Sequence, residues 1–488
     1  MVIRTLALAV VAVLLAACAV GPDHVRPDLA LPDRYARAAS VDPSTAPAPD
    51  AAFWEDFDDP VLDALVADAL RANHDLRIAL ANYERANALL RGAGFDRFPT
   101  VTADGQAASV RQSSAEAPGL PRAARDGDSY SAGIRASWEL DLFGRVRRGV
   151  ESRRADAAAA AADLSALQVA IVGEVVHGYV ALRGAQERLR VARANADNQR
   201  QTLELVEARH AAGRDTGFDT ARARAQLATT QARVPALEAE AAALQHRLAV
   251  LGGRAPDAHV AALSEPGPLP ALPAPLDAGT PGDLLRRRPD IAAAERRLHA
   301  ATARIGVATA DLFPRFTLGG LLGTQALDSS ALFERDSETR LVALGIDWSF
   351  LDVGRVRARM AAADADAAAE LARYEQTVLL ALEDVETALV RHARNLEQEA
   401  HLQRAADDSA RAARLAGQRF DAGAAGLLEV LDAERTLLQA QDAFAQSRTR
   451  TVSSAAVIYR ALAGGWPQHR PVHERISSMA PEAGLSAR

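Results

Sequence analysis

The fold is decided by Tyr130-Ser-Ala-Gly-Ile-Arg-Ala-Ser-Trp-Glu-Leu-Asp141 and by the Gly144-Arg-Val-Arg147 that follows it. The first of these stretches alternates strictly between apolar and polar residues. An extended chain would therefore carry Tyr130, Ile134 and Trp138 on one face and polar side chains on the other. This pattern is typical of a barrel strand with lipid outside and water inside. It also fits a hairpin in a soluble sandwich, so the strand alone leaves both alternatives open.

A very long helix is predicted directly after this strand. Residues 144–212 contain no proline and are rich in Ala, Arg, Glu and Leu. At ~1.5 Å per residue, one continuous helix over this range would be about 100 Å long. Gly213 and Gly217 end the pattern, and residues 219–252 form a second predicted helix. Ordinary globular domains do not contain helices of this length.

The body of the chain is a tandem duplication. Trp138 and Trp348 lie 210 residues apart, and each is followed six residues later by Gly-Arg-Val-Arg. The same offset joins Gly213 to Gly423. Ahead of the tryptophans the offset is 215, as in Phe98-Pro99 and Phe313-Pro314. We therefore expect two copies of one unit, each with a strand pair and a long helix that turns back into a shorter one.

The expected fold class is mainly α with a transmembrane β portion. Four strands per chain cannot close a barrel, and an open sheet edge cannot face lipid, so a barrel has to be assembled from several chains. The predicted segments are a signal peptide (1–17), a lipidated N-terminal segment (18–60), a first repeat (61–254) with strands at 99–111 and 129–142, a Pro-rich linker (255–282), a second repeat (283–465) with strands at 314–325 and 339–352, and a C-terminal tail (466–488).

The N-terminus reads as an export signal. Arg4 precedes an apolar run from Leu6 to Leu15, which is too short to span a membrane comfortably. Leu15-Ala-Ala-Cys18 resembles the lipobox of bacterial lipoproteins, in which the cysteine becomes the acylated first residue. Ala19, in place of Asp, points away from retention at the inner membrane. The alternative is an ordinary signal peptide with an incidental cysteine.

Composition excludes several classes of chemistry. The 56 basic residues are all arginine, because the chain has no lysine, which removes Walker A loops, Schiff-base enzymes and kinases. The single cysteine, Cys18, removes disulfides, thiolate metal sites and a cysteine nucleophile in the body. The net charge of −7 gives no reason to expect nucleic acid. The 11 histidines are scattered, so we expect no metal site, no cofactor beyond a lipid on Cys18, and no enzyme activity.

On these residues the chain resembles the TolC-like outer-membrane factors, specifically the lipoprotein branch that serves tripartite pumps of the resistance-nodulation-division type. The resemblance runs from Cys18 to about Trp466. The motifs that carry it are Cys18-Ala-Val-Gly-Pro-Asp23 with Pro27, Phe53-Trp-Glu-Asp-Phe57 with Asp59-Pro60, Arg288-Pro-Asp-Ile291 through Phe313-Pro314, and the stretch from Gly423 to Arg435.

The resemblance implies a homotrimer whose strands close a twelve-stranded barrel in the outer membrane and whose helices continue as a periplasmic tunnel. It implies a passive exit channel for multidrug efflux, partnered by a periplasmic adaptor protein and an inner-membrane pump. The location implied is the outer membrane of a Gram-negative bacterium, with a lipid anchor. The transported substrate does not follow from the sequence.

The resemblance also places a gate at the periplasmic tip, beside the turns at Gly213 and Gly423. Two acidic residues three apart line the constriction in the family, and they correspond here to Glu429 and Asp432. Residues i and i+3 share a helix face, so three copies would form a ring of six carboxylates that attracts cations.

A family latch that holds the closed tip matches this chain only in part. Its acidic member corresponds to Asp219, but its basic partner falls on Ala425 and its tyrosine on Phe420. An arginine could replace the missing base, although each candidate is equally an ordinary solvated side chain. The candidates are Arg209, Arg214, Arg222 and Arg419.

Two other functions remain as alternatives. The first is an outer-membrane channel for type I protein secretion through an ATP-driven exporter. The second, from a different class, is a lipid-anchored periplasmic coiled-coil tether or adaptor. The tether would need the alternating segments to be soluble hairpins, and it would form no pore.

Overall fold

The computed structural model describes residues 19–36, 52–258, 260–273 and 278–462. The predicted signal peptide, the lipidation site at Cys18 and the C-terminal tail lie outside these residues. The chain divides into two compact units, and both repeats contribute to each. The strand unit holds residues up to Asp28 with Tyr83–Ala161 and Ala293–Glu375. The helical unit holds Leu29–Asn82, Ala162–Ala292 and the residues from Gln376 onward.

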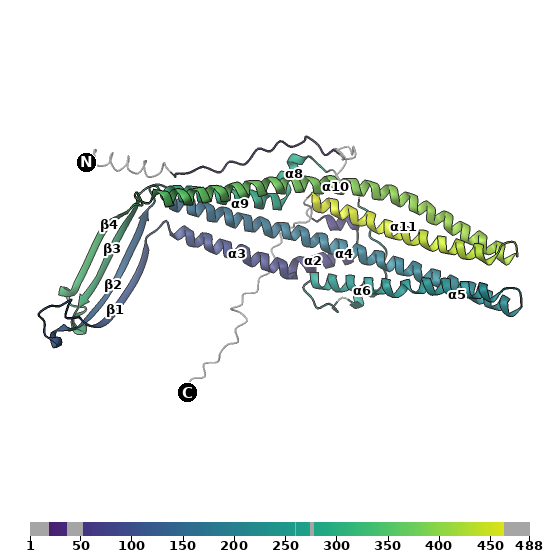
Figure 1. Ribbon diagram of the computed structural model, residues 1–488, viewed down its shortest axis with the longest axis horizontal. Helices are drawn as coiled ribbons and strands as arrows, with labels where there is room; N and C mark the ends of the chain where they lie inside the picture. Colours follow the sequence, from purple (N-terminus) through teal and green to yellow (C-terminus); the bar gives the residue numbers. More distant parts are fainter. Residues whose placement is uncertain (1–18, 37–51, 259, 274–277, 463–488) are drawn as a thin grey trace, which may run out of the picture. The chain divides into compact units, whose positions relative to one another are not determined.

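A four-stranded antiparallel sheet forms the end of the strand unit, in the order β1-β2-β3-β4 (Figure 1). Its strands are β1 (Thr100–Arg111), β2 (Asp126–Leu140), β3 (Arg315–Ala326) and β4 (Glu338–Asp347). The central pair joins the two repeats, with Trp138 opposite Leu318 and Tyr130 opposite Ala326. The strands expected from the alternating patterns are confirmed.

The sheet has one mainly apolar face and one mainly polar face, with exceptions such as Arg340 on the first and Leu341 on the second. Because the register is continuous, Ala103, Ile134 and Leu322 lie side by side on one face, and Gly320 faces Val342 there. Ile134, Leu322 and Val342 are 54%, 69% and 82% exposed. The opposite face carries polar groups such as the ion pair between Arg135 and Asp104, 3.8 Å apart. One side of the sheet therefore suits lipid and the other suits water.

The predicted end of the last strand is wrong. We expected Trp348 and Phe350 to continue the alternation, but β4 ends at Asp347. The last pair of the β3–β4 ladder is Arg315 with Asp347, and the preceding Pro314 has no backbone N–H with which to extend it. The indole Nε1 of Trp348 donates to the carbonyl of Leu312 at 3.0 Å. The Ser349 carbonyl then accepts from Asp352 in the turn that opens the next helix.

Two very long helices run through both units, as expected from the Pro-free stretches. They are α4 (Arg145–Ala211, 67 residues) and α10 (Val353–Asp421, 69 residues). By length and composition alone, one described helix, α4, could cross a membrane, with a stretch of mean hydropathy 1.6. Val172, Val176 and Tyr179 in α4 are fully buried, so helix packing accounts for apolar residues there.

Shorter helices pack beside the long ones (Figure 1). They are η1 (Phe53–Phe57), α2 (Pro60–Ala72), α3 (His74–Phe95), α5 (Gly217–Gln231), α6 (Arg233–Leu251), α7 (Val260–Ser264), α8 (Pro281–Arg287), α9 (Pro289–Ala310) and α11 (Leu427–Ala461), with short 3-10 turns η2 (Arg122–Arg125), η3 (Ser329–Ala331) and η4 (Arg335–Ser337). In the helical unit, Phe53 of η1 stacks on Tyr459 of α11 with ring centroids 4.7 Å apart. The Tyr459 hydroxyl donates to Asp56, so the Phe-Trp-Glu-Asp-Phe motif anchors the N-terminal segment to α11.

The duplication extends to individual hydrogen bonds. In the first repeat, Asn73 Nδ2 donates to the carbonyl of Leu251 at 2.9 Å. At the corresponding positions of the second, Arg288 donates to the carbonyl of Ala461 at 3.1 Å. Trp138 likewise donates to the carbonyl of Arg97 at 3.0 Å, as Trp348 does to Leu312. Each bond ties the end of one element to the start of another, so the two copies share the same joints.

Replacing Asn73 with Ala should cost about 2 kcal/mol, because it removes the bond to Leu251 and the cap on the first amides of α3. Asn87→Ala, whose side chain bonds only within α3, is the matched control and should cost less than about 1 kcal/mol. The measurement is the free energy of unfolding in detergent. Equal losses in the two variants would contradict this assignment.

Candidate functional site

Two helical hairpins, α4–α5 and α10–α11, end in the turns where sequence reasoning placed a gate. Gly213 and Gly423 have φ of +70° and +73°, in the left-handed region. In both turns the next amide donates to the carbonyl five residues earlier, at 2.9 Å in the first and 2.7 Å in the second. A helix end of this kind favours glycine. The glycines predicted as helix breaks therefore build two equivalent tight turns.

Asp219 lies at the start of α5, in a capping box with Thr216. Its carboxylate accepts from the Thr216 amide at 3.0 Å and from the Thr216 hydroxyl at 2.6 Å. These bonds favour the ionised form and hold the pKa of Asp219 below its usual value. The carboxylate predicted as a latch residue is thus engaged by the start of its own helix.

Glu429 and Asp432 lie on the exposed side of the first turns of α11. Asp432 pairs with Arg435 one turn later. Within the described residues, the Glu429 carboxyl has no hydrogen bond or ion pair. The structure thus brings Glu429 and Asp432 together on one helix, while Asp219 begins α5 of the other hairpin.

An apolar tip cluster joins the two hairpins next to their turns. It consists of Val206 from α4, Phe420 from α10, and Leu427, Val430 and Leu431 from α11. Phe420 is only 4% exposed. Phe420, which stands where the family latch has a tyrosine, is therefore the aromatic residue of this cluster.

Arg209 is the arginine that the structure places against the tip cluster. Its guanidinium carbon lies 4.5 Å from the centroid of the Phe420 ring, and its Nε donates to Asp215 at 2.8 Å. Asp215 orients the cation, and the ring face attracts it. Arg222 instead stacks on Phe218 of its own helix, and Arg419 bonds a carbonyl in its own turn.

The sequence offered Arg209 as one of four arginines that could replace the basic residue of the latch. It gave no expectation for Glu434, whose side chain is partly buried. The Glu434 carboxyl accepts from the Thr202 hydroxyl at 2.8 Å across the two hairpins. Burial raises its pKa, and the hydrogen bond only partly offsets this effect. A signal was present in the sequence, because Glu434 occupies the same heptad position as Leu427 and Gln441.

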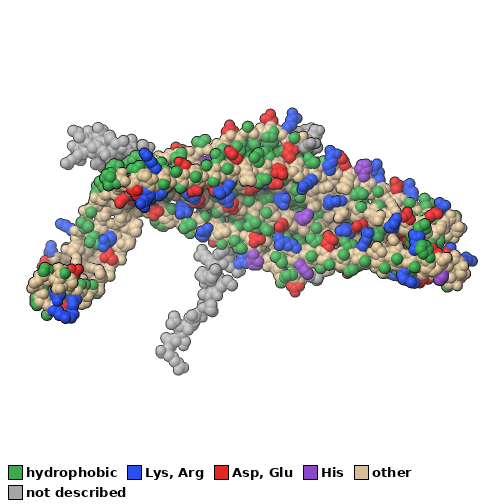
Figure 2. Space-filling view, in the orientation of Figure 1, with side chains coloured by type: hydrophobic (Ala, Val, Ile, Leu, Met, Phe, Trp, Pro, Cys, Tyr) green, Lys and Arg blue, Asp and Glu red, His purple; other side chains and the backbone are tan. Residues whose placement is uncertain are grey.

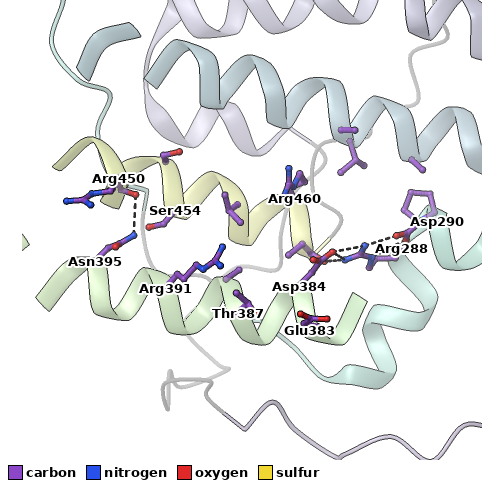
Figure 3. Close-up of a pocket in the computed structure, with 18 residues that line it drawn as sticks. Arg288, Asp290, Glu383, Asp384, Thr387, Arg391, Asn395, Arg450, Ser454 and Arg460 are labelled. Atoms are coloured by element: carbon purple, nitrogen blue, oxygen red, sulfur yellow. Dashed lines mark hydrogen bonds and ion pairs between the residues drawn. The ribbon is translucent and has the colours of Figure 1, made fainter. Parts of the chain in front are cut away.

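The Arg288-Pro-Asp-Ile motif forms a joint in the helical unit (Figure 3). Arg288 pairs with Asp290 and reaches Asp384 on α10 at 3.4 Å. These residues line a cavity of about 630 Å³, which also includes Arg391 and Arg460. The described lining of this cavity therefore combines acidic and basic side chains.

Charges elsewhere on the face shown in Figure 2 are interspersed over the helices, with no stripe of one sign. Among the described residues, no group of three or more His, Cys, Asp or Glu side chains could hold a metal ion. The site is therefore defined by helix ends and packing contacts.

Comparison with protein families gives a match to the model described as "Outer membrane efflux protein", over residues 65–254 and 280–464. The two matched segments correspond to the two repeats. The chain belongs to the outer membrane efflux protein family. Its place is the outer membrane, and family members are transport proteins.

Relatives from this family cover nearly the whole chain. Nodulation protein T of Rhizobium leguminosarum bv. trifolii is 31% identical over 93% of this chain and 96% of its own length. Outer membrane protein OprJ of Pseudomonas aeruginosa is 32% identical over 94% of this chain and 95% of its own length.

Solved structures of outer-membrane channels share the fold. The channel OprN is 43% identical and superposes with a TM-score of 0.84 over 92% of this chain and all of its own. The open state of MtrE from Neisseria gonorrhoeae is 28% identical, with a TM-score of 0.81 over 93% of this chain and all of its own. The recognition of a TolC-like channel fold and of an efflux function is confirmed.

Gly423→Ala should destabilise the second hairpin by about 1 kcal/mol, because a side chain disfavours positive φ. Gly417→Ala, inside α10, is the matched control and should stabilise by up to about 1 kcal/mol. An added Cβ meets nothing within 4 Å at either position, so only the backbone conformation differs. Unfolding in detergent measures both changes, and a loss at Gly417 equal to that at Gly423 would contradict the argument.

Proposed function

We propose that three copies of this chain form a passive exit duct, whose sheets close into one twelve-stranded barrel in the outer membrane. The observation that carries the proposal is the sheet, with its apolar face exposed and the outer edges of β1 and β4 unpaired among the described residues. Unpaired backbone groups in lipid cost several kcal/mol each, by order of magnitude. Pairing β4 of one copy with β1 of the next removes every such edge.

The helical unit also offers surface for other copies. Ile78 on α3 and Leu379 and Leu380 on α10 are 60%, 66% and 51% exposed. Apolar side chains exposed on neighbouring turns favour contact with another protein surface. Packing between copies would cover them in the same assembly that closes the barrel.

The duct would have no chemistry of its own. Energy and substrate selection would come from an inner-membrane pump of the resistance-nodulation-division type, joined through a periplasmic adaptor protein. The described residues present no catalytic constellation, and the helices carry mixed charges that suit a wide and unselective passage.

The N-terminal segment would carry the lipid anchor at Cys18. Support comes from the residues that follow it, which lie against the strand unit. Val20 donates to the Phe143 carbonyl at 3.0 Å, and Arg148 binds Asp23 at 2.6 Å. A Cβ at Gly306 would lie 2.9 Å from the Val20 carbonyl, so this segment is closely fitted. Acylation would fix it at the membrane surface.

The gate would combine two features. Glu429 and Asp432 from three copies would ring the tip with carboxylates and favour cations. Arg209 stacked on Phe420 would hold the two hairpins of each copy together, in place of the family latch that Ala425 has lost. Opening would move the two hairpins apart at the ends that carry the turns at Gly213 and Gly423.

The test is single-channel conductance of the purified, acylated protein in planar bilayers. Glu429→Ala with Asp432→Ala should enlarge a small conductance and reduce its preference for cations. Glu204→Ala with Glu397→Ala removes the same charge from exposed positions on α4 and α10 and is the control. A folded, acylated protein that forms no pore would overturn the duct and favour the tether. A pore indifferent to the mutations would overturn the carboxylate ring.

Arg209→Gln should raise the open probability, because it removes the cation from Phe420 and from Asp215. A stacking contact of this kind is worth about 1 kcal/mol, so an increase of about fivefold is expected. Arg214→Gln, an exposed arginine in the same turn, is the control and should leave the open probability unchanged. Equal effects of the two variants would contradict the latch.

A further inference from the structure

A polar seam joins α4 to α11 in the helical unit, where the two hairpins lie side by side (Figure 1). Arg188, Asn195 and Thr202 are spaced seven residues apart on α4, and each bonds a side chain on α11. The pairs are Arg188 with Asp442 at 2.8 Å, Asn195 with Gln441 at 2.9 Å and Thr202 with Glu434 at 2.8 Å. Seven-residue spacing keeps these side chains on one face of the helix, so the seam fixes the register of the hairpins.

Glu434 is the unusual member of this seam. On α11, Leu427, Leu431, Leu438 and Ala445 follow the same core spacing and are all buried. An acidic residue at such a position is costly unless it is paired or neutral. Its Oε1 accepts from Thr202, whereas its Oε2 is buried without a partner among the described residues.

Among the described residues, the Glu434 carboxyl has no ion pair, and no cation contributes to its pKa shift. The charged groups on the helices packed around it have other partners. Arg209 pairs with Asp215 in the first turn, and Arg435 pairs with Asp432 on α11. On α5, which also contacts α11, Arg222 stacks on Phe218 and Arg224 pairs with Glu207. On α4, the neighbouring Gln199 is 2% exposed and neither atom of its side-chain amide has a partner in the described residues. One oxygen of the carboxyl is thus shielded from water with no cation beside it among the described residues, although the residue as a whole is only partly buried.

We propose that Glu434 makes the contact between the hairpins a proton-dependent joint. Its carboxyl group is neutral when α4 and α11 pack against each other and ionised when they part. The packed form binds the proton more tightly, because only the parted form lets water solvate the carboxylate. Packing is therefore favoured at low pH and is lost as the pH rises through the raised pKa of Glu434. Any effect on transport rests on the proposed duct, whereas the joint itself does not.

The test measures the separation of the hairpins directly. Nitroxide labels are placed at Leu205→Cys on α4 and Leu428→Cys on α11, both exposed, and distances are recorded in trimers diluted with unlabelled chain. In the wild-type background, the parted population should grow as the pH is raised above the usual range of a glutamate carboxyl, by at most about tenfold per pH unit for one carboxyl. An absence of pH response would overturn the proposal.

Glu434→Gln keeps the size of the side chain and an acceptor for Thr202 but cannot ionise. It should stay packed across the whole pH range. Glu204→Gln, an exposed change of the same charge on α4, should behave as wild type. A wild-type pH response in Glu434→Gln, or its loss in Glu204→Gln, would overturn the assignment to Glu434.

Thr202→Val gives a second test if Glu434→Gln fails to fold. It removes the donor that stabilises the ionised form, so the transition should move to higher pH. Thr436→Val, whose hydroxyl bonds only its own helix, is the matched control. An unmoved transition in Thr202→Val would contradict the joint. A pH-dependent distance in a protein that does not conduct would reject the duct and keep the joint.

Discussion

The pairing of backbone groups at the edges of the sheet is the constraint on which the rest of the structure depends. β2 and β3 are paired on both sides, whereas β1 and β4 each have an outer edge that no other described strand pairs. The same sheet exposes Ile134, Leu322 and Val342 on one face. In lipid the apolar face is favourable, but the edges are tolerated only if another strand closes them. The proposed assembly with other copies follows from this property of the sheet.

The tandem repeat explains how one chain supplies both a piece of barrel wall and a pair of hairpins. Each copy contributes two strands and one hairpin, and equivalent bonds from Asn73 and Arg288 fasten equivalent helix ends. The copies differ in the returning helix, which is divided into α5 and α6 in the first and continuous as α11 in the second, and in the contacts at the tip. Asp219 caps the first hairpin, while the corresponding Glu429 leaves its carboxylate exposed. The duplication therefore accounts for the repeated strands and hairpins, and the sequence differences between the two turns account for the candidate gate.

Periodicity made the strands and long helices predictable, since it depends only on neighbours along the chain. Trp348 escaped this reasoning, because β4 needs a partner strand: its last pair is Asp347 with Arg315, and Pro314 before it cannot donate a backbone hydrogen bond. Asp219 was singled out by family position, yet its carboxylate is held by Thr216, a local contact that the sequence also allowed. Contacts between distant segments, such as Arg209 with Phe420 and Thr202 with Glu434, needed the structure, because spacing alone does not say which helices pack together.

Closure of the sheet by neighbouring copies is tested most directly by cross-linking. The body of the chain has no cysteine, so pairs can be introduced with one on the outer edge of β1 and one on that of β4. Oxidation of the outer-membrane protein should then produce covalent species that end at the trimer on a denaturing gel. A ladder that stops at the dimer, continues beyond the trimer, or consists only of cross-links within one chain would contradict the account.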